Sequence, residues 1–321
     1  MRRSPLFVAA LAFPLALTVS PAFADDTLKV AIGQMELWTN QVPTLGQRAG
    51  IFKKYGIVLE NFATQGAGET LQAVISGSAD LGFGVGTHGV MRAFARGAPV
   101  RIMAASFTGA GDIYWYVRAD SPIQKLADAT EKHTIAYSTN GATSHNVVLA
   151  YAAELGVKAK PTATGGLPAT MTQVMSEQID IGWGAAPFGL KEEKEGKIRI
   201  ISTGNDAPSL RSQTVRVEVA NAELLKQRYD VFLRFMRGFR ETLSWMYADP
   251  QAITYYSQQF GWPEDMARLT RDRFQTKDAK QIDRISDVDR LMAEGIKLKF
   301  LDKPLSKDEL SELIQIPPAG S

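Results

Sequence analysis

The chain has 321 residues, of which 45% are hydrophobic and 22% are charged. Its 36 Lys and Arg side chains nearly balance its 34 Asp and Glu side chains, which gives no electrostatic support for a general role on nucleic acid or on an acidic membrane surface. The chain contains no cysteine, and this excludes disulfide bonds, thiolate nucleophiles and cysteine metal ligands.

The N-terminal segment has the three parts of a secretory signal peptide. Arg2 and Arg3 provide a positive start, a largely apolar run covers residues 6–19, and small residues end at Ala24. A membrane anchor is the alternative, but the run is shorter than the roughly 20 apolar residues that a spanning helix needs. We therefore expect a signal peptide at residues 1–24, cleavage after Ala24 and a location in the periplasm.

From residue 27 onward, short apolar runs alternate with longer amphipathic ones. Strands are predicted at residues 28–32, 57–62, 80–84, 100–105, 113–118, 134–137, 179–183, 198–201 and 214–219. Helices are predicted at residues 44–55, 68–76, 88–96, 143–155 and 168–176, and after residue 221 the chain is mostly helical up to residue 314. This alternation predicts an α/β fold with mainly parallel sheets and helices on both faces.

The chain changes character near residue 114, where an aromatic-rich strand begins a second α/β series. We expect lobe 1 to start with residues 25–115, lobe 2 to cover residues 116–213, and residues 214–314 to return to lobe 1 with the C-terminal helices, leaving a tail at residues 315–321. The two crossings between lobes would form a hinge. Residues 78–84 resemble residues 177–183, and this short internal similarity fits two similar lobes.

Ligands of open α/β sheets bind beyond the carboxyl ends of the strands. The corresponding loops cover residues 33–41, 64–69, 84–89, 138–144, 165–169 and 183–189, and they are rich in small and polar residues. Most precede a predicted helix, whose first N–H groups are unpaired and face the loop side. The candidate ligand-binding residues are Trp38, Asn40, Gln65, Gly66, Thr87, His88, Asp112, Asn140, Thr143, Ser144 and Trp183.

Several of these candidates have alternative roles. Trp38 stands among polar residues, which favours contact of its ring with ligand over burial in a core, whereas Trp183 ends a strand and fits either role equally. Asn140 and Thr143 are also suited to cap a helix, a role compatible with facing a ligand. Because the loops contain no Arg or Lys, they favour a neutral or nitrogen-bearing ligand without excluding a sulfonate or another anion.

Enzymatic motifs are weak in this sequence. Residues 84–89 match Gly-x-Gly-x-x-Gly, but they follow the third predicted strand, and the next strand ends without the acidic residue that would hold a ribose. The three histidines lack metal-binding spacing, and no Gly-x-Ser-x-Gly elbow is present. We predict no cofactor, no metal and no catalysis; the alternative is a secreted lyase or dehydratase that uses Glu36 or Asp112 as a general base.

Three segments carry a family likeness, at residues 50–60 (GIFKKYGIVLE), 71–82 (LQAVISGSADLG) and 178–183 (QIDIGW). They resemble the corresponding segments of nitrate-, sulfonate- and taurine-type periplasmic binding proteins, a group that also includes receptors for thiamine pyrimidine precursors. The resemblance implies a type II, two-lobed binding protein that closes on a small solute and delivers it to the membrane permease of an ABC importer. A monomer is the simpler expectation for such a closing receptor. An iron-dependent, cysteine-rich enzyme shares this fold, and the absence of cysteine excludes that branch.

Overall fold

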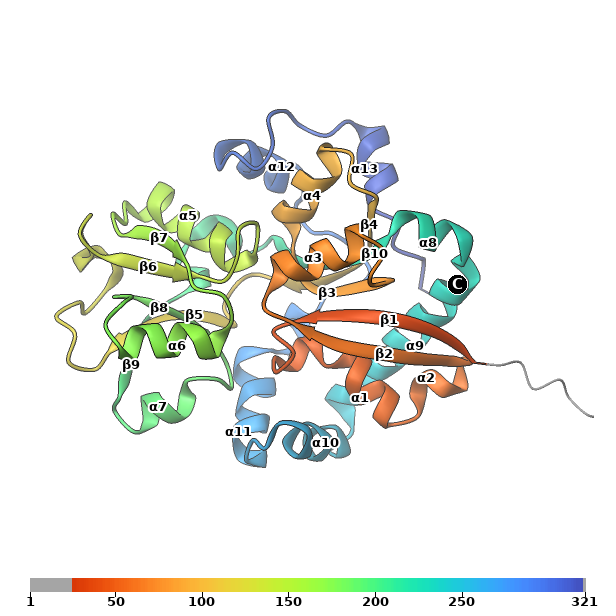
Figure 1. Cartoon of the computed structure of the whole chain (residues 1–321), viewed down its shortest axis with the longest axis horizontal. Helices are drawn as coiled ribbons and strands as arrows, with labels where there is room; N and C mark the ends of the chain where they lie inside the picture. The colour runs from red at the N-terminus through yellow and green to blue at the C-terminus, as the bar shows by residue number, and fades with distance from the viewer. Residues whose placement is uncertain (1–24, 320–321) are drawn as a thin grey trace, which may run out of the picture.

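The computed structural model describes residues 25–319, so the predicted signal peptide lies outside the described residues. Two groups of strands and helices lie side by side, and we call them the larger and the smaller lobe (Figure 1). Within residues 25–319, no helix combines the length and the apolar character needed to cross a membrane.

The larger lobe is built on a five-stranded sheet. Its strands are β1 (Asp26–Gly33), β2 (Ile57–Thr64), β3 (Leu81–Gly86), β4 (Val100–Thr108) and β10 (Thr214–Asn221). They follow the order β2–β1–β3–β10–β4, in which β1 is parallel to β2 and β3, and β10 is antiparallel to β3 and β4. In β1, Leu28, Val30 and Ile32 belong to one core and Ala31 to another, so both faces of the sheet are covered.

Helices from distant parts of the chain cover these two faces. One face packs against α1 (Val42–Arg48), α2 (Ile51–Lys54), α8 (Ala222–Gln227), α9 (Tyr229–Ala248), α10 (Gln251–Phe260) and α11 (Glu264–Leu269). The other face packs against α3 (Ala67–Ile75), α4 (Thr87–Ala95), α12 (Val288–Lys297) and α13 (Lys307–Leu313). Phe83 of β3 meets Phe239 of α9 edge-on at 5.6 Å between ring centroids, so the C-terminal helices complete this core.

The smaller lobe contains the other strands. They are β5 (Ile113–Arg118), β6 (Thr134–Tyr137), β7 (Lys160–Ala163), β8 (Gly182–Ala185) and β9 (Ile198–Thr203). β5 lies between β8 and β9 and is antiparallel to both, while β6 and β7 form a parallel pair that a bridge from Ile135 to Ile181 links to β8. The helices are α5 (Thr143–Leu155), α6 (Leu167–Met175) and α7 (Leu190–Lys194).

Each lobe contains one antiparallel strand reached by a crossing of the chain. The chain leaves the larger sheet after β4 and enters the smaller one as β5, and it returns to the larger sheet as β10. The sequence placed the first boundary between residues 115 and 116, but residues 113–115 already pair with β8 and β9. The whole aromatic strand thus belongs to the smaller sheet, and all of its residues except Arg118 are buried.

Two other elements differ from the sequence expectations. The helix predicted at residues 44–55 is two helices, α1 and α2, because Gly50 adopts a left-handed conformation with φ of 73° between them. β7 was not predicted, because its sequence, Lys-Pro-Thr-Ala, is short and polar and contains a proline. Short turns of other helix types complete the chain: η1 (Trp38–Asn40), η2 (Leu126–Asp128), η3 (Gly204–Asp206), η4 (Pro208–Leu210), η5 (Thr270–Phe274) and η6 (Lys277–Ala279).

Candidate functional site

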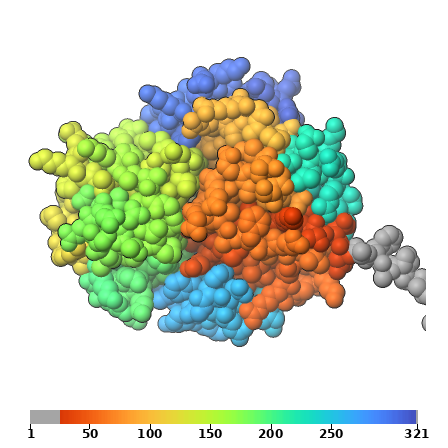
Figure 2. Space-filling view, viewed as in Figure 1, coloured from red at the N-terminus to blue at the C-terminus, as the bar shows by residue number. Residues whose placement is uncertain are grey.

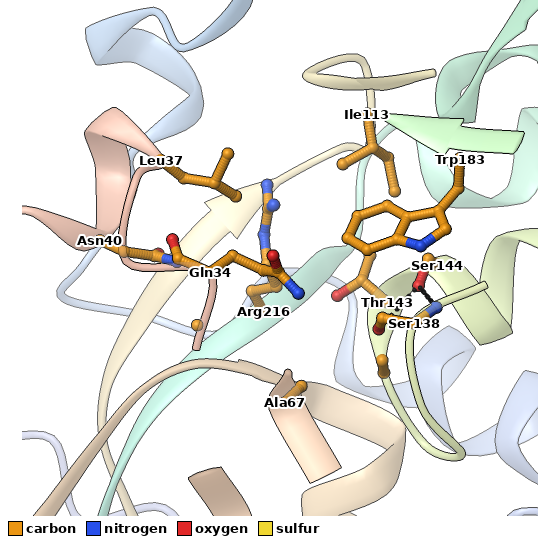
Figure 3. A pocket seen from close by; sticks show the side chains of 12 residues that line it. Gln34, Leu37, Asn40, Ala67, Ile113, Ser138, Thr143, Ser144, Trp183 and Arg216 are labelled. Carbon is orange, nitrogen blue, oxygen red and sulfur yellow. Dashed lines mark hydrogen bonds between the residues drawn. The ribbon is translucent and has the colours of Figure 1, made fainter. Parts of the chain in front are cut away.

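A small pocket of about 30 Å³ lies between the two lobes (Figure 3), and the space between its walls, open solvent included, is about 380 Å³. The larger lobe and the smaller lobe contribute equally to its lining. The lining residues are Gln34, Leu37, Asn40, Ala67, Gly84 and Arg216 from the larger lobe, and Ile113, Ser138, Ala142, Thr143, Ser144 and Trp183 from the smaller lobe. A solute in this pocket would therefore touch both lobes at once.

The loop after β1 forms the larger lobe's wall. The amide nitrogen Nδ2 of Asn40 donates a hydrogen bond to the backbone oxygen of Gly33 at 2.6 Å, which holds the side chain beside the end of β1. Gly84 lies against this amide with φ of 74°, and a Cβ atom there would come within 2.7 Å of Asn40 Nδ2. Glycine at position 84 is thus required both by its backbone conformation and by the close approach of Asn40.

The start of α5 forms the opposite wall. The hydroxyl of Ser144 accepts a hydrogen bond from the backbone N–H of Ser138 at 3.0 Å and lies 3.1 Å from the Ser138 hydroxyl. Thr143 donates its hydroxyl proton to the backbone oxygen of Val215 in β10, at 3.1 Å. These bonds attach the pocket wall of the smaller lobe to the strand that returns to the larger lobe. Figure 3 shows the indole of Trp183 pointing into the space between Ile113 and Ser144.

Four of the lining residues carry an unpaired buried polar atom, which is a donor in three of them and an acceptor, Oδ1, in Asn40. Gln34 Nε2, Trp183 Nε1 and Arg216 Nε are buried and have no hydrogen-bond partner among residues 25–319. α3 and α5 begin at the pocket, and neither N-cap residue caps its helix with a side chain. Apart from the Gly68 N–H, which Thr139 accepts, their first N–H groups add further donors. Since an unpaired buried donor is costly, this arrangement is suited to a ligand group rich in acceptor oxygens.

Arg216 is the one charged residue in the lining, and its charge is balanced. Its guanidinium donates to the carboxylate of Asp112 at 2.6 Å and lies 4.5 Å from the centre of the Phe107 ring. Burial raises the pKa of Asp112, and the neighbouring Arg216 opposes that shift. Because the pair is deeply buried, removal of either partner would leave an uncompensated charge inside the protein.

A second buried ion pair supports the same strand. Lys280 lies 3.2 Å from a carboxylate oxygen of Glu218, two positions along β10 from Arg216, and the other Glu218 oxygen accepts the backbone N–H of Gly84 at 2.9 Å. Burial lowers the pKa of Lys280, and the charge of Glu218 opposes that shift. These contacts hold β10 and the end of β3 together beneath the pocket.

The structure brings four of the sequence-predicted residues into the pocket lining: Asn40, Thr143, Ser144 and Trp183. The others lie around it. Asp112 supports Arg216, Thr87 donates its hydroxyl proton to the backbone oxygen of Thr214, and Gly66 precedes the start of α3. Gln65 is exposed beside Gly66, and the amide oxygen of Asn140 accepts the hydroxyl proton of Tyr137 while the residue faces a separate surface groove.

Two expectations from the sequence are wrong. Trp38 is fully buried in the core of the larger lobe, edge-on to Tyr256 at 5.2 Å and Tyr247 at 6.1 Å between ring centroids. His88 is also buried, bonded through Nε2 to the backbone oxygen of Leu291 and stacked on Phe300. In both cases, C-terminal helices and loops cover a side chain whose own surroundings in the sequence look exposed.

Eight lining residues were not predicted from the sequence: Gln34, Leu37, Ala67, Gly84, Ile113, Ser138, Ala142 and Arg216. Most lie in the loops expected to face ligand, but Arg216 lies inside a strand. The sequence carried a signal, because Arg216 and Glu218 interrupt a strand that is otherwise apolar between its polar ends, Thr214 and Asn221. In the structure, all eight residues of β10 are buried. A buried charge in such a strand needs a partner or a ligand. Among the described residues, no group of His, Cys, Asp and Glu is arranged to hold a metal ion.

Comparison with known proteins gives the family. The family model for NMT1/THI5-like proteins matches residues 42–253, most of the described chain. The chain belongs to the NMT1/THI5-like family. A search of the curated proteins found no match to this sequence.

Solved structures of binding proteins share the fold. The alkanesulfonate-binding protein SsuA from Xanthomonas axonopodis pv. citri, bound to MOPS, has a TM-score of 0.74 at 14% identity, over 91% of this chain and 98% of that one. The aliphatic sulphonate-binding protein SsuA from Escherichia coli has a TM-score of 0.69 at 17% identity, over 91% of this chain and 92% of that one. The nitrate-binding protein NrtA from Synechocystis PCC 6803 has a TM-score of 0.68 at 16% identity, over 90% of this chain and 86% of that one. The predicted two-lobed periplasmic binding protein fold is confirmed.

Proposed function

We propose that this NMT1/THI5-like chain is the solute-binding component of an ABC importer. It is exported by the signal peptide at residues 1–24, works as a monomer in the periplasm and delivers its solute to a membrane permease. The observation that carries the proposal is the pocket between the lobes, whose lining residues from both lobes carry buried and unpaired donors. The related binding proteins for sulfonates and nitrate support the same role.

The lobes in this proposal follow the sheets. The larger lobe comprises residues 25–112 and 214–314, the smaller lobe comprises residues 113–213, and the two crossings between them act as the hinge. Closure around this hinge would bring the two pocket walls together on the solute. The tail begins near residue 315, whose backbone N–H donates to Ile102 of β4.

The donors favour a solute with an acceptor-rich head group. Gln34, Trp183 and the start of α5 would hold oxygen atoms of the head, and Arg216 would add a positive guanidinium already paired with Asp112. Leu37, Ile113 and the indole face of Trp183 offer a compact apolar surface for the rest of the molecule. A small sulfonate, including one that carries a heterocycle, satisfies both requirements, which shifts the expectation away from a neutral ligand.

The enzyme alternative gains no support. Asp112, one of its two candidate bases, is already paired with Arg216. Glu36, the other, is not among the lining residues, although burial raises its pKa. The family and the similar solved structures are those of substrate-binding proteins.

Isothermal titration calorimetry of the mature chain, residues 25–321, tests the proposal. The panel comprises short alkanesulfonates, MOPS and nitrate, with ethanolamine as a cation control. We expect at least one sulfonate to bind with a Kd below about 100 μM, or roughly 5.5 kcal/mol of binding free energy, and to be recovered unchanged after incubation. Binding of ethanolamine alone, or chemical conversion of a bound solute, would contradict the proposed function.

A further inference from the structure

The Gly-x-Gly-x-x-Gly stretch at residues 84–89 lies where the two lobes touch. Gly86 ends β3 and Gly89 lies in the first turn of α4, both in the larger lobe. Opposite them is the loop of the smaller lobe that contains Gly141, just before α5. Figure 2 shows the orange surface of the larger lobe in direct contact with the green surface of the smaller lobe on the viewed face.

At this contact, backbone meets backbone. A Cβ atom on Gly86 would lie 2.5 Å from the backbone oxygen of Gly141 and 2.9 Å from the backbone nitrogen of Thr143. A Cβ atom on Gly89 would also lie 2.5 Å from the Gly141 oxygen and 3.3 Å from its Cα atom. Both distances to oxygen are far shorter than normal contacts, and the obstructing atoms are backbone, which cannot rotate away as a side chain can. We call Gly86, Gly89 and Gly141 the glycine seam.

A hydrogen bond next to the seam also joins the lobes. The backbone N–H of Gly68, in the first turn of α3, donates to the hydroxyl of Thr139 in the smaller lobe at 3.0 Å. Gly141 has φ of 86°, a left-handed conformation that favours glycine. The loop of residues 139–141 thus fits against the starts of α3 and α4, and the pocket lining at Ala142, Thr143 and Ser144 follows directly in the chain.

We propose that the three glycines of the seam are positioning residues for solute capture, because they let the lobes approach until both pocket walls reach the same solute. This inference rests on the proposed importer function for its biological meaning. It also gives the Gly-x-Gly-x-x-Gly stretch a role in this chain without a nucleotide. Gly89 does not line the pocket, so a side chain there acts only through the separation of the lobes.

Disulfide trapping measures that separation directly, and the absence of native cysteine makes the readout clean. The reference protein is the mature chain with Gly68→Cys and Thr139→Cys. The Cβ position at residue 68 lies 3.2 Å from the Thr139 Cβ, close to the roughly 3.5–4.5 Å typical of disulfides. The rate of cross-linking in oxidised glutathione then reports how often the lobes meet as they do in this structure.

The test adds Gly89→Ala to the reference protein. The matched control is Arg96→Ala, at an exposed position directly after the end of α4. We expect Gly89→Ala to slow cross-linking by about tenfold or more, since an added methyl group must push two backbones apart. Arg96→Ala should leave the rate within about twofold. The melting temperature of Gly89→Ala should not fall, because alanine is the better helix former.

A second variant, Gly86→Ala, should slow cross-linking in the same direction and keeps the test valid if Gly89→Ala folds poorly. Cross-linking of Gly89→Ala at the reference rate would overturn the proposal. A reference protein that fails to cross-link at all would also overturn it, because the lobes would then not meet at this seam. The readout requires no solute, so failure of the calorimetric panel and failure of the glycine seam are separate results.

Discussion

Replacing Trp183 by phenylalanine tests the donor set of the pocket. The change removes the indole N–H but keeps an aromatic ring on the pocket wall. In the structure, Trp183 lines the pocket, and its Nε1 is buried and has no partner among the described residues. A hydrogen bond to a charged group contributes about 1.5–3 kcal/mol. If this N–H holds an oxygen of the solute head, Trp183→Phe should therefore weaken binding by about 10- to 150-fold.

The assay is calorimetry at neutral pH with the tightest-binding sulfonate of the panel. Trp38→Phe is the matched control, because it makes the same chemical change in the core of the larger lobe, away from the pocket lining. Its affinity should stay within about twofold of the parent. Parent-like affinity in Trp183→Phe, with the control also unchanged, would refute the assignment of the indole N–H to the solute.

Three further predictions concern stability. Trp38→Ala should lower the free energy of unfolding by about 3–5 kcal/mol and the melting temperature by on the order of 10 °C in a calorimetric scan, since the ring is fully buried; an unchanged melting temperature would contradict that burial. Arg216→Met should lower the free energy of unfolding in urea by about 3–5 kcal/mol, because Asp112 stays buried without a partner. Adding Asp112→Leu should restore most of that stability, and an equal loss of stability in the single and double variants would disprove the pairing. Burial, reinforced by Arg92, lowers the pKa of His145 from 6.5 to about 4. Below pH 6.5 the folded state thus binds fewer protons than the unfolded state. The stability that neutral, buried His145 contributes is therefore complete above pH 6.5 and is lost as pH falls through 4. His145→Gln should reduce the decline in urea midpoint between pH 7 and 4.5, and a decline identical to that of the parent protein would contradict this reasoning.

The order of elements was predictable because hydrophobic period and turn residues are local signals. α5 begins and ends at the predicted residues, and the strand at residues 113–118 coincides with β5. The pocket was predictable in part for the same reason, since the carboxyl ends of strands carry Asn40, Thr143, Ser144 and Trp183 to one place.

The errors arose where distant segments decide the surroundings of a residue. Trp38 looks exposed in its own loop, but Tyr247 and Tyr256, more than 200 residues later, enclose its ring. Arg216 was missed because its partner, Asp112, lies on the other crossing between the lobes, far away in the chain. Neither contact leaves a local pattern in the sequence.

The central claim is that one solute is held by both lobes at once. The most direct measurement is a crystal structure of the mature chain grown with the tightest-binding solute of the panel. The account predicts density for the solute between Gln34 and Asn40 on one side and Ser144 and Trp183 on the other, within hydrogen-bonding distance of donors from each lobe. A solute that contacts residues of a single lobe, or that lies outside this pocket, would contradict the account.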